Sequence, residues 1–106
     1  LKGAELCLVP TAWLGPAEEG ELSLRTRALD NTFFVAGADL INNSPGLICR
    51  GLSMIAGPHG EILARAKPGT DCVIDAVLDP EVMLAQRIRV PLLRDRKPKY
   101  YKALSE

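Results

Sequence analysis

The sequence predicts an α/β fold in which a strand–helix–strand unit is followed by an antiparallel meander. Two short, nearly continuous apolar runs at residues 5–10 and 33–40 flank a stretch with helical periodicity, and turn-rich segments follow. A strand, a helix and a strand in this order and of this length are typical of a βαβ unit, whose strands are parallel. In total we expect about five strands and two helices.

Residues 5–10 are expected to form a strand covered on both faces, because their run is almost entirely apolar. The following segment, PTAWLGP, turns away from the sheet and carries Thr11 and Trp13 with it. Ligands bind where the strands of open α/β sheets end, so these two side chains are candidates for lining a pocket. The alternative for Trp13 is a plain packing role, since tryptophan is usually well buried.

Residues 18–31 give the clearest helix prediction. Glutamates crowd the start, and Arg25 and Arg27 come later, which matches the helix macrodipole. Glu21 and Arg25 are also an i,i+4 ion pair. Asn31 closes the helix, and residues 33–40 then form a second buried strand. The expected apolar stripe consists of Leu22, Leu24, Ala28 and Leu29.

The chain beyond residue 46 is expected to form a half-exposed meander. After the loop INNSPG, residues 47–56 and 61–66 pair as an antiparallel hairpin across the turn GPHG at residues 57–60. Residues 71–78 form a further strand, with Asp75 on its polar face. The opposite face of that strand carries Cys72, Ile74, Ala76 and Leu78.

A second helix is predicted to begin at Asp79, an N-cap acceptor followed by a proline and then by Glu81 in the first turn. Val90, just before a proline, ends it. Its apolar face is expected from Val82 or Leu84 together with Ala85 and Ile88. The remaining residues, 92–106, are polar, basic and expected to be extended before a terminal turn.

Two features indicate that the chain is part of something larger. Two helices are few for a sheet whose first strands are buried on both sides, so one face lacks its cover. Gly3 has the place of a glycine in the left-handed conformation just after a helix, yet only Leu1 and Lys2 precede it. We therefore expect residues 1–106 to form a single, partial domain.

The composition limits which binding partners and which cellular compartment we expect for the protein. The chain has 106 residues, 47% hydrophobic and 25% charged, which is typical of one globular domain. Its 13 basic and 13 acidic residues cancel, so no global field favours nucleic acid or a membrane surface. No apolar stretch reaches the length of a membrane span. Cys7, Cys49 and Cys72 are widely spaced within apolar runs, which indicates reduced, buried thiols in a cytoplasmic protein.

The residues themselves offer little chemistry. His59, the only histidine, lies in a predicted turn and is expected to be exposed rather than catalytic. No metal or cofactor is predicted, because the sequence lacks ligand pairs and a glycine-rich phosphate loop. Residues 94–102, RDRKPKYYK, could hold a phosphate or stack a base, but a solvated tail is favoured since nothing extends the basic patch.

Four segments carry a more specific indication: GAELCLVPTAW, RALDNTFFVAGAD, GLSMIAGPHGEILARA and LLRDRKPKYY. In this order and spacing they resemble the C-terminal half of the nitrilase superfamily, the carbon-nitrogen hydrolases. The resemblance covers practically the whole chain and is strongest to the aliphatic and N-carbamoyl amidases. It implies the C-terminal portion of a four-layer α-β-β-α sandwich that assembles into homo-oligomers.

The resemblance also implies how the reaction is divided. In this family a cysteine attacks the amide or nitrile carbon, a glutamate is general base and acid, and a lysine stabilises the tetrahedral intermediate before water hydrolyses the thioester. All three would lie N-terminal of this chain, and Cys7 falls at an ordinary strand position, so no catalytic residue is expected here.

Thr11 and Trp13 match the strand-end segment near the nucleophile and are the expected substrate contacts. Asp39 stands where many members carry asparagine, and its role stays open. Residues 94–98 match a tail motif that indicates packing or assembly.

Two hypotheses follow. In the first, the chain is the C-terminal part of a cytoplasmic amidohydrolase that cleaves non-peptide C–N bonds of small amides or N-carbamoyl compounds, is inactive alone, forms a homo-oligomer and binds neither nucleic acid nor membranes. In the second, it is a non-catalytic remnant that acts as a binding or assembly module. Such a module would hide its open sheet face by self-association.

Overall fold

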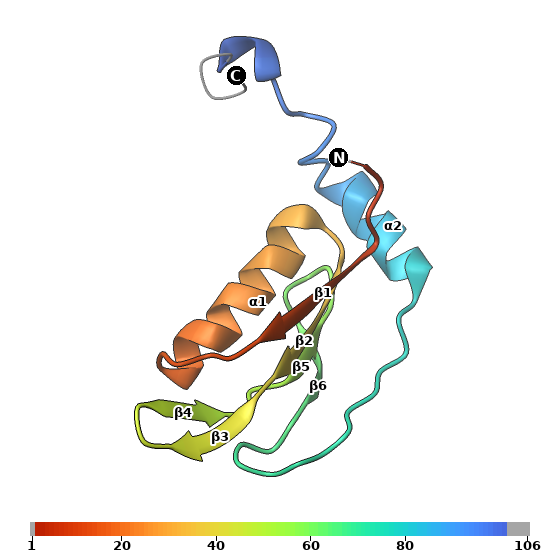
Figure 1. Cartoon of the computed structure of the whole chain (residues 1–106). Helices are drawn as coiled ribbons and strands as arrows, with labels where there is room; N and C mark the ends of the chain where they lie inside the picture. The colour runs from red at the N-terminus through yellow and green to blue at the C-terminus, as the bar shows by residue number, and fades with distance from the viewer. Residues whose placement is uncertain (1, 102–106) are drawn as a thin grey trace.

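The computed structural model describes residues 2–101 and confirms the α/β class (Figure 1). Its main sheet has the strand order β1-β2-β5-β6. The first two strands are parallel and the other neighbours are antiparallel, so the predicted βαβ unit is confirmed. The strands of this sheet are β1 (Leu6–Thr11), β2 (Phe34–Asp39), β5 (Met54–Ala56) and β6 (Ile62–Arg65).

Helix α1 (Ala17–Asn31) packs on one face of the main sheet (Figure 1). Ala28, Val35 and Ala56 are fully buried between them and form the core. Gly37 allows the close approach, because a β-carbon there would lie 2.7 Å from Leu24 Cδ1. Four half-buried apolar residues surround the core: Cys7, Val9, Leu24 and Phe33.

The predicted apolar stripe of α1 is wrong in two of its members. Leu22 is 65% exposed and Leu29 is 43% exposed. The face turned to the sheet instead follows Gly20, Leu24 and Ala28, which are spaced four apart and therefore lie in one row. Leu24 in that row packs over Gly37, where the strand has no side chain, so the space available on the sheet helps to decide which helix residues are buried.

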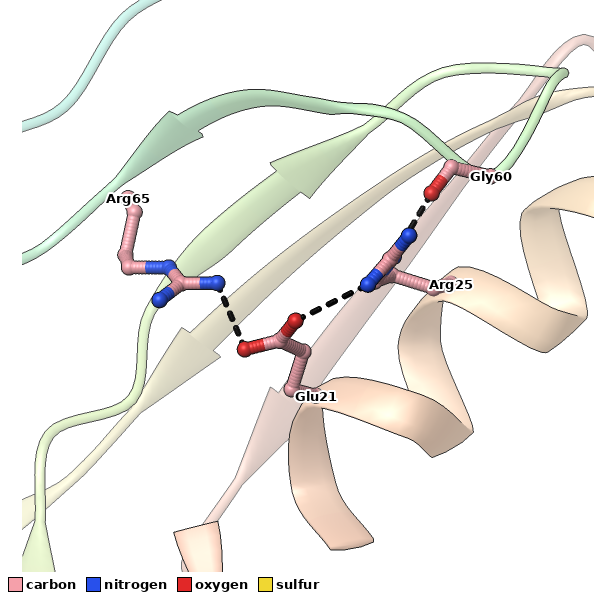
Figure 2. A network of polar contacts seen from close by, with 4 residues as sticks. All are labelled: Glu21, Arg25, Gly60 and Arg65. Atoms are coloured by element: carbon pink, nitrogen blue, oxygen red, sulfur yellow. Dashed lines mark hydrogen bonds and ion pairs between the residues drawn. The ribbon is translucent and has the colours of Figure 1, made fainter. Parts of the chain in front are cut away.

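An ion-pair network connects α1 to β6, the strand at one edge of the main sheet (Figure 2). Glu21 Oε1 lies 3.0 Å from Arg25 Nη1, which confirms the predicted i,i+4 pair, and Glu21 Oε2 lies 2.5 Å from Arg65 Nη2. Arg25 Nε also donates to the Gly60 carbonyl at 2.7 Å. The side chains of the ion pairs are 28–50% exposed, so each pair contributes modestly to stability.

The predicted hairpin of residues 47–56 with 61–66 is correct only in its second half. Strand β5 pairs with β6 as expected. However, β4 (Leu47–Arg50) pairs with β3 (Ile41–Ser44) in a separate two-stranded sheet. Strand β3 lies in the segment INNSPG, which the sequence predicts to be a loop. Gly51, with φ +68°, divides β4 from β5, because an extended strand cannot continue through a left-handed residue.

The predicted strand at residues 71–78 is wrong. The segment is extended, but within the described residues its backbone makes no hydrogen bond and it joins neither sheet. Part of the predicted alternation persists, since Ile74, Ala76 and Leu78 are half-buried. Val73 and Val77 are 94% and 90% exposed, and Cys72 is exposed as well. A strand requires a neighbour, and sequence alternation alone does not supply one.

Helix α2 (Pro80–Arg89) begins as predicted, with the Asp79 carboxylate accepting from the Glu81 N–H at 2.9 Å. The predicted apolar face is wrong, because α2 buries Met83 and Gln86. The predicted Val82, Leu84 and Ile88 are 37%, 44% and 80% exposed.

The position of α2 at the end of the sheet accounts for this difference. Arg87 donates from Nε to the Thr32 carbonyl at 3.1 Å and from Nη2 to the Ala4 carbonyl at 2.9 Å. These bonds turn the Arg87 side of the helix toward the body of the molecule. Residues 92–100 are exposed and include the 3-10 helix η1 (Pro98–Tyr100), and this tail extends away from the sheet (Figure 1). Residues 102–106, with the predicted terminal turn and Lys102, lie outside the described residues.

The second face of β1 is open, so the prediction that β1 is covered on both faces is wrong within this chain. Leu6 is 41% exposed and Leu8 is 69% exposed. The expected uncovered face is therefore found here. Gly3 has φ +83°, which confirms its predicted left-handed conformation. No helix in residues 2–101 is long and apolar enough to cross a membrane.

Candidate functional site

The candidate site lies at the carboxyl ends of β1 and β2. These strands are parallel, and Thr11 at the end of β1 lies directly beside Asp39 at the end of β2. The Leu40 N–H donates to the Thr11 carbonyl at 3.0 Å, so the pairing continues to the last residue of each strand. The chain then leaves the sheet on both strands, which is the geometry that forms ligand crevices in α/β proteins.

A cavity of about 140 Å³ lies between these strand ends and the middle of α1. Both predicted pocket residues, Thr11 and Trp13, line it, so the structure brings the two together. Their role as substrate contacts stays a prediction. The full lining comprises Val9, Thr11, Trp13, Gly20, Ser23, Leu24, Arg27, Asp39 and Leu52.

Trp13 combines the two roles considered for it. Its Nε1–H donates to the Pro16 carbonyl at 2.9 Å, which fixes the indole over the start of α1. Gly15 and Gly20 make room for the ring, since a β-carbon at either position would lie 3.1–3.2 Å from Trp13 Nε1. The indole therefore packs on the helix and forms a wall of the cavity at the same time.

Asp39 is the residue that joins the loops of the site. Its Oδ1 accepts from the Trp13 N–H at 2.8 Å, and its Oδ2 accepts from the Leu52 N–H at 2.8 Å. Its own N–H donates to Ser53 Oγ at 2.9 Å. The sequence alone gives this residue no role. The available signal was a lone acid that closes a buried strand next to a candidate pocket.

Helix α1 supplies the polar side of the cavity through Ser23 and Arg27. Arg27 Nη1 donates to the Ser23 carbonyl at 3.2 Å and also to Ser23 Oγ. From the sequence, Arg27 has a role only in matching the helix macrodipole. Its i,i+4 spacing from Ser23 was the signal that the two side chains meet on one face.

The three cysteines and His59 do not meet. Cys49 is buried, Cys7 is half-buried against the core and Cys72 is exposed, and all three are free thiols, so the predicted burial holds fully only for Cys49. His59 is exposed as predicted, and its Nδ1 lies 3.4 Å from Arg89 Nη2. Within residues 2–101 no cysteine thiol is hydrogen-bonded to a histidine or carboxylate. The arrangement can bind and orient a ligand, but its described residues present no nucleophile–base pair.

Solved structures define the class of fold. A carbon-nitrogen hydrolase from Helicobacter pylori G27 matches with a TM-score of 0.85 and 23% identity, covering 99% of this chain and 42% of that one. Nit3 of Saccharomyces cerevisiae, a member of branch 10 of the nitrilase superfamily, matches with a TM-score of 0.78 and 33% identity over 91% of this chain and 36% of that one. The fold is therefore of the nitrilase-superfamily type.

The sequence comparison names the family. The model of the carbon-nitrogen hydrolase family matches residues 1–87, and the chain belongs to this family. It is 37% identical over 108 residues to a Pseudomonas protegens protein described as a hydrolase in the pqqF 5′ region. It is 36% identical over 104 residues to an omega-amidase of Xenopus tropicalis. These alignments cover 100% and 94% of this chain but only 37% of each relative's length.

Proposed function

We propose that this chain is the C-terminal, substrate-binding part of an amidohydrolase that cleaves non-peptide C–N bonds in small amides or N-carbamoyl compounds. The observation that carries the proposal is the similarity to an omega-amidase along 94% of the chain. The cavity at the ends of β1 and β2, with Thr11 and Trp13 in its wall, supports a binding role for this part.

The proposal divides the reaction between two parts of one hydrolase. A cysteine thiolate outside this chain attacks the carbonyl carbon, and a lysine there stabilises the oxyanion. A glutamate donates a proton to the nitrogen, which leaves as ammonia from a primary amide or as the amine from an N-carbamoyl compound, and a thioester remains. Water, deprotonated by the same glutamate, then hydrolyses the thioester to the acid and regenerates the thiolate. This division agrees with the described residues, where no cysteine has a base beside it.

Ammonia release tests the proposal. The 106-residue chain and the complete hydrolase that contains it are each incubated with an ω-amide of a dicarboxylic acid and with an N-carbamoyl amino acid. We expect the complete hydrolase to release ammonia and the chain alone to remain at background. The matched control is Cys7→Ser in the complete hydrolase, which should keep more than about half of the activity, because Cys7 packs in the core rather than at the strand ends. Turnover by the chain alone, abolished by serine at Cys7 or Cys72, would overturn the proposal.

A second candidate function, an assembly module without catalysis, is favoured by one observation. Leu8, Val73 and Val77 are 69%, 94% and 90% exposed, and exposed apolar surface of this kind is commonly an interaction site. This candidate requires the chain to self-associate. Native mass spectrometry of the 106-residue chain distinguishes the outcomes, because a well-folded monomer would contradict it.

A further inference from the structure

The carboxylate of Asp39 bridges two loops that are far apart in the sequence. One oxygen accepts a hydrogen bond from the Trp13 N–H, just beyond β1, at 2.8 Å. The other accepts from the Leu52 N–H, just before β5, also at 2.8 Å. Both loops line the cavity of about 140 Å³. The bridged residues are 26 and 13 positions from Asp39. The carboxylate therefore fixes the width of the cavity between Trp13 and Leu52.

Only a carboxylate fits this pair of contacts. Both partners are backbone N–H donors, so both side-chain oxygens must accept. An asparagine has one accepting oxygen, and its NH₂ group would face the second N–H donor, so one of the two bonds would be lost. Asp39 has no ion-pair partner among the described residues, and the two N–H dipoles stabilise its charge. These bonds are of the charge-assisted kind and are stronger than neutral ones.

We propose that Asp39 is a positioning residue that sets the shape of the substrate cavity by holding the Trp13 loop against Leu52. This inference rests on the proposed function for one point, which is that Thr11 and Trp13 border the substrate. Thr11 precedes the bridged Trp13 by two residues and lies beside Asp39 in the strand register. Loss of the bridge therefore releases Trp13 next to Thr11, while Thr11 itself stays paired in the β1–β2 ladder.

The first test measures the bridge directly in the 106-residue chain. Asp39→Asn is expected to raise amide hydrogen exchange at Trp13 or Leu52 by at least about tenfold, since one of two charge-assisted bonds is lost. The emission of Trp13, the only tryptophan, should shift to the red and become more accessible to acrylamide. Amides within the β1–β2 ladder should exchange as before. The matched control is Asp95→Asn, which removes an exposed carboxylate paired only with Arg94.

The second test measures positioning in the complete hydrolase. Asp39→Asn should raise KM for the amide substrate by about tenfold while kcat changes by less than about threefold, because the variant widens the cavity and leaves the nucleophile in place. Asp95→Asn should change neither constant. This separation of KM from kcat is not expected from a general loss of stability.

The outcomes separate the inference from the proposed function. Unchanged exchange at Trp13 and Leu52 would overturn the bridge. Raised exchange with an unchanged KM would overturn the positioning role, while leaving amide hydrolysis intact. A complete wild-type hydrolase that releases no ammonia contradicts the proposed function instead, and the exchange data still decide whether Asp39 holds the loop.

Discussion

The two faces of the main sheet differ although they are built from the same strands. On the side of α1, Val35 and Ala56 are fully buried and Cys7 and Val9 pack against them. On the opposite side, Leu8 of the same β1 is 69% exposed. The residues of β1 are almost as apolar on one face as on the other. The contrast shows that apolar sequence indicates what a strand can bury, whereas burial itself depends on the layer that covers it.

The largest expected change in the free energy of unfolding comes from placing a charge on the buried face of the sheet, compared with the same charge on the open face. Val35→Asp should cost about 4 kcal/mol or more and leave the chain largely unfolded, because an unpaired carboxylate would replace a side chain with no solvent exposure. Leu8→Asp should cost less than about 1 kcal/mol. Urea unfolding followed by circular dichroism measures both. A similar loss at Leu8 would show that the open face is covered in solution.

A smaller effect is expected from adding one methyl group at Gly37. Gly37→Ala should cost about 1–3 kcal/mol, since the new β-carbon would lie 2.7 Å from Leu24 Cδ1 under α1. The added variant Leu24→Ala should recover part of the loss and give a coupling energy of at least about 0.5 kcal/mol. The control is Ala38→Val on the exposed side of β2, with a change within about 0.5 kcal/mol. Additive effects of Gly37→Ala and Leu24→Ala would contradict this account of the close approach.

The smallest effect concerns the ion pairs that hold α1 to β6. Glu21→Gln removes the contacts with Arg25 and Arg65 (Figure 2) and should cost about 0.5–1 kcal/mol at low ionic strength. The cost should decrease in 1 M NaCl, because the pairs are partly exposed and salt screens them. Glu18→Gln is the control, since Glu18 is another glutamate of α1 but belongs to none of the ion pairs. An equal loss at both salt concentrations would indicate packing rather than charge.

Helix starts and the order of strands and helices could be predicted from short stretches of sequence. Asp79 followed by a proline begins α2, and the order of apolar runs predicts parallel β1 and β2. The contact faces of the helices were not predictable in this way. Leu22 has the helical spacing of a core residue and is exposed, because it lies outside the row of Gly20, Leu24 and Ala28 that α1 turns to the sheet.

The candidate site was predictable in its location and less so in its construction. Thr11 and Trp13 come at and just after the end of β1, and both line one cavity. The bridging role of Asp39 depends on strand register and on the fold of residues 50–53, which bring Leu52 to the same place. Such contacts between distant segments have no periodic signal in the sequence. The division of β4 from β5 at Gly51 is of the same kind, since β4 pairs with β3, a segment whose composition predicts a loop.

Within the described structure, the backbone N–H and C=O groups of residues 71–78 make no hydrogen bonds to other backbone groups. The side chains of Val73 and Val77 in the same segment are exposed. An extended, apolar segment with free backbone groups is the type that stacks with copies of itself into fibrils. Asp71 and Asp75 lie four positions apart in it, and Asp79 follows directly after it as the N-cap of α2. In a parallel stack each carboxylate would stand about 4.8 Å from its own copy. Repulsion between identical charges would therefore oppose this in-register stacking, so self-association through Val73 and Val77 would need another arrangement.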